Sequence, residues 1–143
     1  MSILLINILH ETLTVNGLHL LQLLMAAFLG ILFLQSGLDK IFDYKGNLAY
    51  LTEHFKNSPL SHFIGFLLPV ITLLEVAAGL LSAAGVLALF FGNQVIAYWG
   101  NVLAAAALLA LFFGQRIAKD YGGAATLVAY FMLTMFGLYI HTL

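Results

Sequence analysis

The stretch FIGFLLPVITLLEVAAGLLSAAGVLALFF, residues 63–91, decides the fold of this 143-residue chain. Its only polar side chains are those of Thr72, Glu75 and Ser82. A helix needs roughly 20 apolar residues to cross the hydrocarbon core of a membrane, so this stretch is longer than one crossing requires. Pro69 lacks a backbone N–H and predicts a kink. We therefore expect a membrane-spanning helix that tilts, bends or protrudes from the bilayer.

Three further apolar runs flank this stretch, at 18–38, 95–113 and 123–140. The whole chain is 63% hydrophobic and 8% charged, with a mean hydropathy of +1.06, whereas a soluble domain carries roughly 25% charged residues. Four spans and their connections use nearly all of the chain and leave no room for a soluble catalytic domain. The sequence therefore predicts a single all-α domain, a polytopic integral membrane four-helix bundle in the lipid bilayer.

The basic residues predict how the spans are oriented. All five lie in the connections after the first and third spans: Lys40, Lys45, Lys56, Arg116 and Lys119. Because Lys and Arg are enriched in cytoplasmic loops, both of these connections are predicted to be cytoplasmic. The short turn at 92–94 and both termini are then on the non-cytoplasmic side of the cell (inner) membrane.

The connection between the first two spans carries its own helical pattern. Between residues 47 and 56, Leu48, Leu51 and Phe55 recur at helical spacing. This predicts a short amphipathic helix in the cytoplasmic membrane interface, with a solvated loop as the alternative. The apolar segment 3–9 is too short to span, and we expect it to lie along the opposite interface.

Glu75 is the most informative residue, because it lies well inside the second span. An ionised carboxylate at that depth costs about 2.5–3.5 kcal/mol on insertion scales, so the side chain should be neutral or paired and should face the bundle interior. Two interpretations stay open. Glu75 is a catalytic group that carries a proton or binds a ligand, or it makes an interhelical hydrogen bond that determines helix packing.

Two other polar residues are candidates for the same site. Lys40 ends the first span, and its long side chain makes it the natural partner of Glu75, although a role as a cytoplasmic anchor fits equally well. Asn101 lies within the third span, where an unpartnered amide is costly. It binds a ligand carbonyl or Glu75, or it makes an interhelical hydrogen bond.

Several classes of function have no support in the sequence. A net charge of −1 gives no basis for nucleic-acid binding. The absence of cysteine excludes disulfides, thiolate catalysis and iron–sulfur clusters. The five histidines lie near segment ends, without the spacing of a metal or haem site. No phosphate-binding or hydrolase motif is present.

The chain resembles the DoxX-like family of small four-helix integral membrane proteins. The similarity in helix number and loop layout covers nearly the whole chain. Two motifs carry the resemblance: Gly30-x-x-Phe33-x-x-x-Gly37-x-x-Lys40 at the end of the first span, and Leu74-Glu75-x-x-x-Gly79-Leu80-Leu81 in the second.

The family takes its name from a membrane subunit of a thiosulfate:quinone oxidoreductase, so the resemblance implies a membrane subunit that passes electrons to quinone. In that role Glu75 exchanges a proton, and Lys40 and Asn101 bind the quinone. Since no residue here carries an electron by itself, a bound cofactor or a partner subunit is required.

Two alternatives to this function remain open. One is a non-enzymatic accessory, anchor or assembly subunit of a larger membrane complex. The other is a small proton-coupled transporter. In either case we expect other membrane subunits or further copies of this chain as partners.

Overall fold

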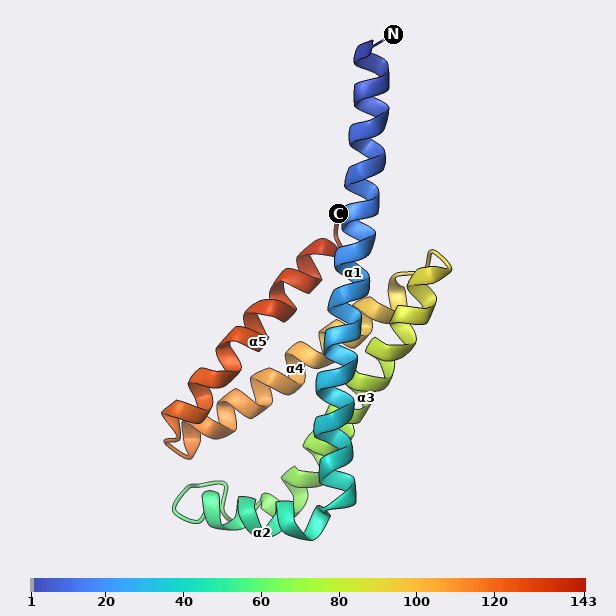
Figure 1. The fold of residues 1–143 in the computed structure, drawn as a ribbon. Coiled ribbons are helices and arrows are strands. Elements are labelled where there is room, and N and C mark those ends of the chain that lie inside the picture. The colour runs from blue at the N-terminus through green and yellow to red at the C-terminus, as the bar shows by residue number, and fades with distance from the viewer. Residues whose placement is uncertain (1) are drawn as a thin grey trace.

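The computed structural model describes the backbone of residues 2–143 and the side chains of residues 2–13 and 16–143. This part of the chain is all-helical and contains no strand, which confirms the predicted all-α class. Figure 1 shows its five helices, which are α1 (Ser2–Phe42), α2 (Tyr44–His54), α3 (Ile64–Phe90), α4 (Val95–Ile117) and α5 (Tyr121–Ile140). Four of them, α1, α3, α4 and α5, are long and apolar enough to cross a membrane.

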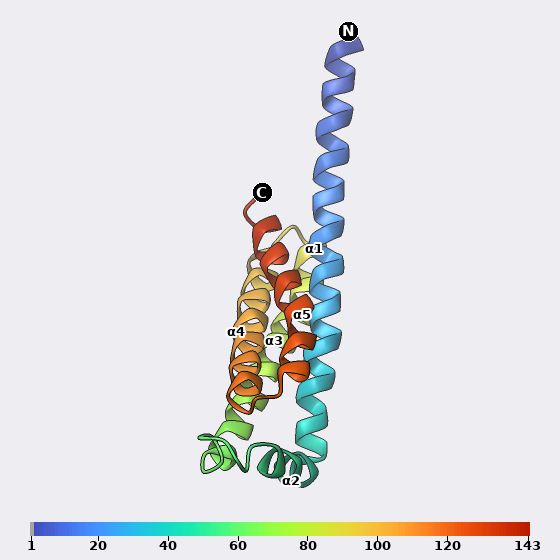
Figure 2. The ribbon, with the colours of Figure 1, turned by 90° about the vertical axis from the view of Figure 1, so that its left-hand side faces the viewer.

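The first helix differs from its prediction. We expected a span at 18–38 and a separate segment at 3–9, but α1 runs without a break from Ser2 to Phe42. Neither proline of the chain lies in this region, and Gly17 alone does not end a helix. The segment 3–9 therefore continues the first helix and projects beyond the other helices (Figures 1 and 2).

The long helices pack in the order α1, α3, α4, α5, each against the next. Glycines bring their backbones close together. A Cβ added at Gly79 of α3 would lie 2.6 Å from the backbone nitrogen of Leu34 in α1, and one added at Gly85 would lie 2.6 Å from the Cα of Ala97 in α4. Small residues at these crossings are what close packing of apolar helices requires.

The connection between α1 and α3 contains the short helix α2 and is not the solvated loop that was the alternative. The predicted range was 47–56, whereas α2 begins at Tyr44 and ends at His54. It begins earlier because the Asp43 side chain caps it, accepting a hydrogen bond from the backbone N–H of Gly46 at 3.2 Å. Figure 2 shows α2 lying across the ends of the long helices.

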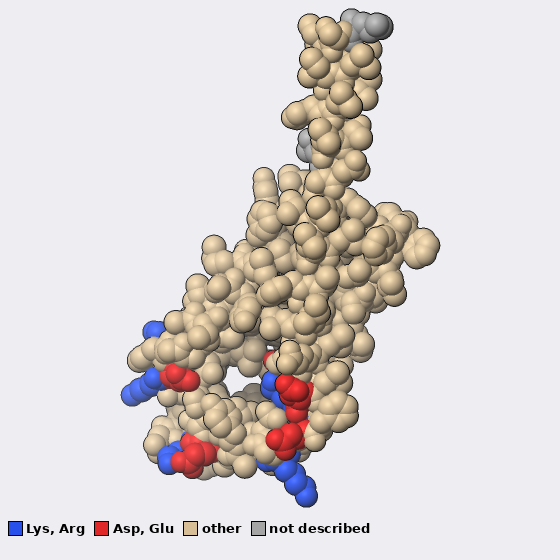
Figure 3. Space-filling view, viewed as in Figure 1, with Lys and Arg blue, Asp and Glu red and all other residues tan. Residues whose placement is uncertain are grey.

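Charged side chains gather at the end of the molecule that holds α2 (Figure 3). The surface is hollowed there, between α2 and the adjoining ends of α4 and α5. The two connections that carry Lys and Arg therefore lie at the same end of the fold.

Candidate functional site

Glu75 and Lys40 form an ion pair between α3 and α1. The Lys40 Nζ lies 2.9 Å from Glu75 Oε2, and the two side chains are 16% and 1% exposed, respectively. Glu75 thus faces the interior, as its position in an apolar span predicts. Lys40 therefore pairs with Glu75, which is the first of the two interpretations of this lysine.

Ser36 completes this cluster, and the sequence interpretation missed it. Its hydroxyl donates to Glu75 Oε1 at 3.0 Å, and Lys40 Nζ donates to the Ser36 hydroxyl at 3.1 Å and to its backbone carbonyl at 3.3 Å. The sequence could have indicated Ser36, because it is four residues before Lys40 and residues four apart share one helix face. We call Ser36, Lys40 and Glu75 the carboxylate cluster.

The helix crossing explains why these groups meet. A Cβ added at Gly37 of α1 would lie 2.6 Å from Cγ2 of Val76 in α3. Gly37 and Val76 are neighbours in sequence of Ser36 and Glu75, so the two helices also pack closely beside the cluster, with the added Cβ 3.1 Å from the backbone nitrogen of Val76. The lysine stem then reaches inward from the last turn of α1.

One oxygen of the Glu75 carboxylate accepts no hydrogen bond among the described residues. Glu75 Oε2 contacts Lys40 as an ion pair, but within the described structure no donor meets it with hydrogen-bond geometry. A buried acceptor without a hydrogen bond is uncommon and costly. Glu75 Oε2 is therefore paired with the Lys40 ammonium by charge alone within the described structure.

Asn101 is not part of the carboxylate cluster. It is 1% exposed and donates through Nδ2 to the backbone carbonyl of Thr134 in α5 at 2.9 Å. Its neighbour Gly100 lies against Ser82, which is roughly two helical turns along α3 from Glu75. The structure thus brings together two of the three predicted site residues and places Asn101 in the α4–α5 contact.

A second polar cluster lies at the ends of the long helices that are remote from α2. Gln22 of α1 donates to Gln94 Oε1 at 2.8 Å, and His141 Nδ1 lies 3.3 Å from the same oxygen. Burial lowers the pKa of His141 below its ordinary value of 6.5. The lowered pKa favours the neutral ring, which donates to this amide oxygen when its proton is on Nδ1.

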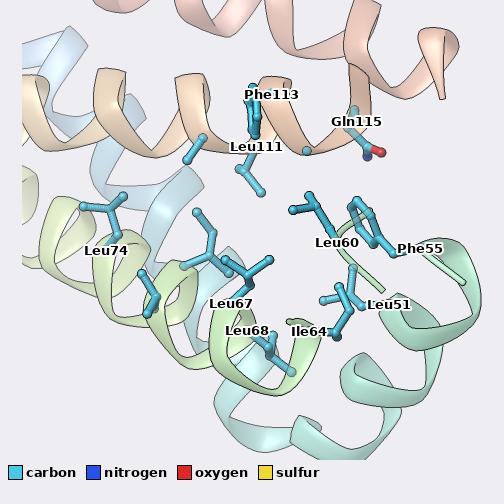
Figure 4. Close-up of a pocket in the computed structure, with 14 residues that line it drawn as sticks. Leu51, Phe55, Leu60, Ile64, Leu67, Leu68, Leu74, Leu111, Phe113 and Gln115 are labelled. Carbon is cyan, nitrogen blue, oxygen red and sulfur yellow. The ribbon is translucent and has the colours of Figure 1, made fainter. Parts of the chain in front are cut away.

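An apolar cavity of about 250 Å³ lies between α2, α3 and α4. Leu74 lines one end and Gln115 the other, with Leu51, Phe55 and Leu67 among the side chains that point into it (Figure 4). Except for the amide of Gln115, the side chains around it are hydrocarbon. The sequence interpretation did not foresee this cavity.

A polar pocket of about 520 Å³ lies at the α2 end of the fold, where its lining residue His54 is next in sequence to Phe55 of the cavity. Its walls include Glu53, His54, Lys56 and Lys119. His54 Nε2 lies 2.8 Å from Gln115 Oε1 and 3.5 Å from Asp120 Oδ2. His54 therefore contacts both Gln115, a cavity-lining residue near the end of α4, and Asp120, the residue that caps α5.

No group of three or more His, Asp or Glu side chains in the described part of the chain is arranged to hold a metal ion. Comparisons with protein-family models, with curated proteins and with solved structures gave no match for this chain. The resemblance to the DoxX-like family stays a prediction that rests on the two motifs.

Proposed function

We propose that the chain is an integral membrane protein that crosses the cell membrane with α1, α3, α4 and α5. Its four long apolar helices and its basic connections at one end support this proposal. In this arrangement α2 lies in the cytoplasmic interface, and both termini are on the non-cytoplasmic side.

We further propose a DoxX-like function, the quinone-interacting membrane subunit of a redox system. The observation that carries this proposal is the carboxylate cluster, a buried glutamate held by a lysine and a serine with one oxygen free of hydrogen bonds. A buried ionisable group in a membrane helix is a functional candidate by default.

The residues of the cluster have distinct tasks in this function. A quinone supplies an acceptor for two electrons and two protons, and the electrons come from a partner subunit or its cofactor. Lys40 donates a hydrogen bond to a quinone oxygen and stabilises negative charge on it. Glu75 holds and transfers a proton at Oε2. Ser36 orients the carboxylate through Oε1, while Asn101 lies too far along the bundle to share the same oxygen.

The test is the quinone content of the protein purified in mild detergent, measured by mass spectrometry. We expect stoichiometric quinone in the wild type and its loss in Glu75→Gln. Thr72→Val is the matched control, because Thr72 is buried in α3 and its hydroxyl bonds only to its own helix at Leu68. A wild type without quinone, or a Glu75→Gln variant that keeps it, would refute the proposal.

A second candidate, an accessory or anchor subunit, is favoured by uncovered apolar surface. α5 packs mainly against α4, and Val128, Met132 and Phe136 on it are exposed. In a membrane such a face contacts lipid chains, a neighbouring membrane subunit or a second copy of this chain. Co-purification of a stoichiometric partner, with no quinone and no effect of Glu75→Gln beyond stability, would favour this candidate.

A further inference from the structure

The lining of the apolar cavity indicates what kind of group fills it. Its one polar side chain, Gln115, has its carbonyl oxygen 2.8 Å from His54, and Glu75 is not among the lining residues. A polar ring in this space would leave its oxygens without partners, which is costly, whereas a hydrocarbon chain would lose nothing. An empty space of this size would also forfeit the dispersion contacts of its walls.

The cavity opens toward the side of the bundle. Val70 of α3 and Phe113 of α4 line it and are 45% and 59% exposed, respectively. In a membrane these two side chains face the lipid chains, so a chain enters between α3 and α4 without crossing water. At the α2 end, the buried ring of Phe55 forms part of the wall.

The polar pocket is lined by one carboxylate, that of Glu53, and has an excess of one positive charge. Two lysines line it, Lys56 and Lys119. Lys56 is paired with Glu53, whereas Lys119 is exposed and makes no ion pair among the described residues. Arg116, one turn before Lys119, lies over the ring of Tyr121. Lys119 is therefore the lysine of this pocket that is available to an anion.

The backbone of Lys119 is also unusual. Its φ of 60° lies in the left-handed region, at the position after the end of α4 where glycine is the common residue. The following N–H, that of Asp120, donates to the carbonyl of Gln115 at 2.9 Å, as a left-handed helix end requires. A lysine at this position therefore adopts a backbone conformation that glycine adopts at lower cost, and its side chain lines the polar pocket.

We propose that the two spaces together bind one anionic phospholipid from the leaflet next to α2. One acyl chain occupies the apolar cavity, and the phosphate lies in the polar pocket against Lys119. This site is separate from the carboxylate cluster and does not depend on the proposed function of Glu75. The acyl chain of the bound lipid fills the cavity and contacts α2, α3 and α4, so it stabilises the position of α2.

The experiment is native mass spectrometry of the full chain released from bilayers of mixed phosphatidylglycerol and phosphatidylcholine. We expect one retained phosphatidylglycerol on the wild type. Ala110→Phe, which fills the cavity, should abolish this retention. Ala106→Phe is the matched control, because Ala106 is exposed on the same helix and does not line the cavity. Gly114→Val is a second cavity-filling variant, since a Cβ there only touches the Phe55 ring at 3.5 Å.

The headgroup is tested with Lys119→Asn, because asparagine tolerates the left-handed backbone and lacks the charge. We expect about fivefold weaker retention of phosphatidylglycerol, the effect of one basic residue near an anionic lipid surface. Retention of phosphatidylcholine should not change. Inorganic phosphate, added without lipid, should not bind.

Four outcomes would overturn this inference. They are unchanged lipid in both cavity-filling variants, equal retention of the two lipids by the wild type, binding of inorganic phosphate alone, and a quinone in place of the lipid. The last outcome would move the hydrocarbon tail of the quinone into the cavity and leave the proposed function intact. Loss of quinone in Glu75→Gln with lipid retention unchanged would in turn separate the two sites.

Discussion

At the scale of single residues, the ion pair of Glu75 and Lys40 carries a desolvation cost, because Glu75 is fully buried and Lys40 mostly so. Both charges leave water, and their mutual attraction offsets this only because the geometry is close and Ser36 adds a hydrogen bond. Lys40 is well placed for this, because its ammonium also lies at the C-terminal end of α1, where the helix dipole favours positive charge.

Removing one partner of this pair should be more harmful than removing both charges. Lys40→Met leaves the Glu75 carboxylate buried without a counter-charge, and we expect it to lower the free energy of unfolding by about 3 kcal/mol. The double variant Lys40→Met with Glu75→Gln should recover most of this loss. Unfolding in mixed detergent, followed by circular dichroism, measures both values. Simple addition of the two single effects would show that the residues are not coupled.

His141 predicts a dependence of stability on pH. Burial lowers its pKa in the folded protein below the unfolded value of 6.5, so between these two values the unfolded chain binds more protons. Stability is therefore fully present above pH 6.5 and decreases as the pH falls through the lowered pKa. The midpoint of thermal unfolding, measured across this window, should fall with pH in the wild type and less steeply in His141→Asn. Equal slopes would contradict this assignment.

At the scale of helices, the contact between α1 and α3 depends on glycines. Gly79→Ala would put a Cβ 2.6 Å from the backbone nitrogen of Leu34, which cannot move aside as a flexible side chain does. We expect this variant to lose about 1–3 kcal/mol of stability and to separate Lys40 from Glu75.

The matched control for this substitution is Gly65→Ala on the same helix. A Cβ there has nothing within 4 Å, so the gain in helix propensity should leave stability unchanged or raise it by up to about 1 kcal/mol. Both variants are measured by thermal unfolding in the same detergent. If Gly79→Ala is as stable as Gly65→Ala, the close approach is not what holds the helices in register.

At the scale of the whole molecule, α1 is too long for a single crossing. Its 41 residues extend about 60 Å, twice the thickness of a hydrocarbon core. The segment that projects beyond the other helices includes Ile3, Leu4 and Ile6, all exposed. About half of α1 therefore exceeds what a single crossing of the hydrocarbon core requires.

The orientation of the molecule has a direct test, because the chain has no cysteine. Thr52→Cys in α2 and Asn93→Cys in the 92–94 turn both place a thiol at an exposed position. With a reagent that does not cross membranes, we expect Asn93→Cys to react in intact cells and Thr52→Cys to react only after permeabilisation. The reverse pattern would place α2 outside and contradict the interpretation of the basic residues.

The sequence by itself determined that the chain has four long apolar helices and that Glu75 is buried, although it did not determine where the first helix begins. Helix formation and hydropathy are local properties, since each backbone hydrogen bond closes within one turn and each span is recognisable from its own residues. For the same reason the interior position of a lone glutamate in residues 63–91 was predictable.

Only the tertiary structure decided which polar groups meet. The pairing of Asn101 with Thr134 and the inclusion of Ser36 with Glu75 depend on the crossing and register of helices distant in sequence. The apolar cavity and the position of Lys119 beside the polar pocket depend on where α2 lies against α3 and α4. Crossings are determined by the close packing of whole helix faces, and no periodicity within a single helix encodes them.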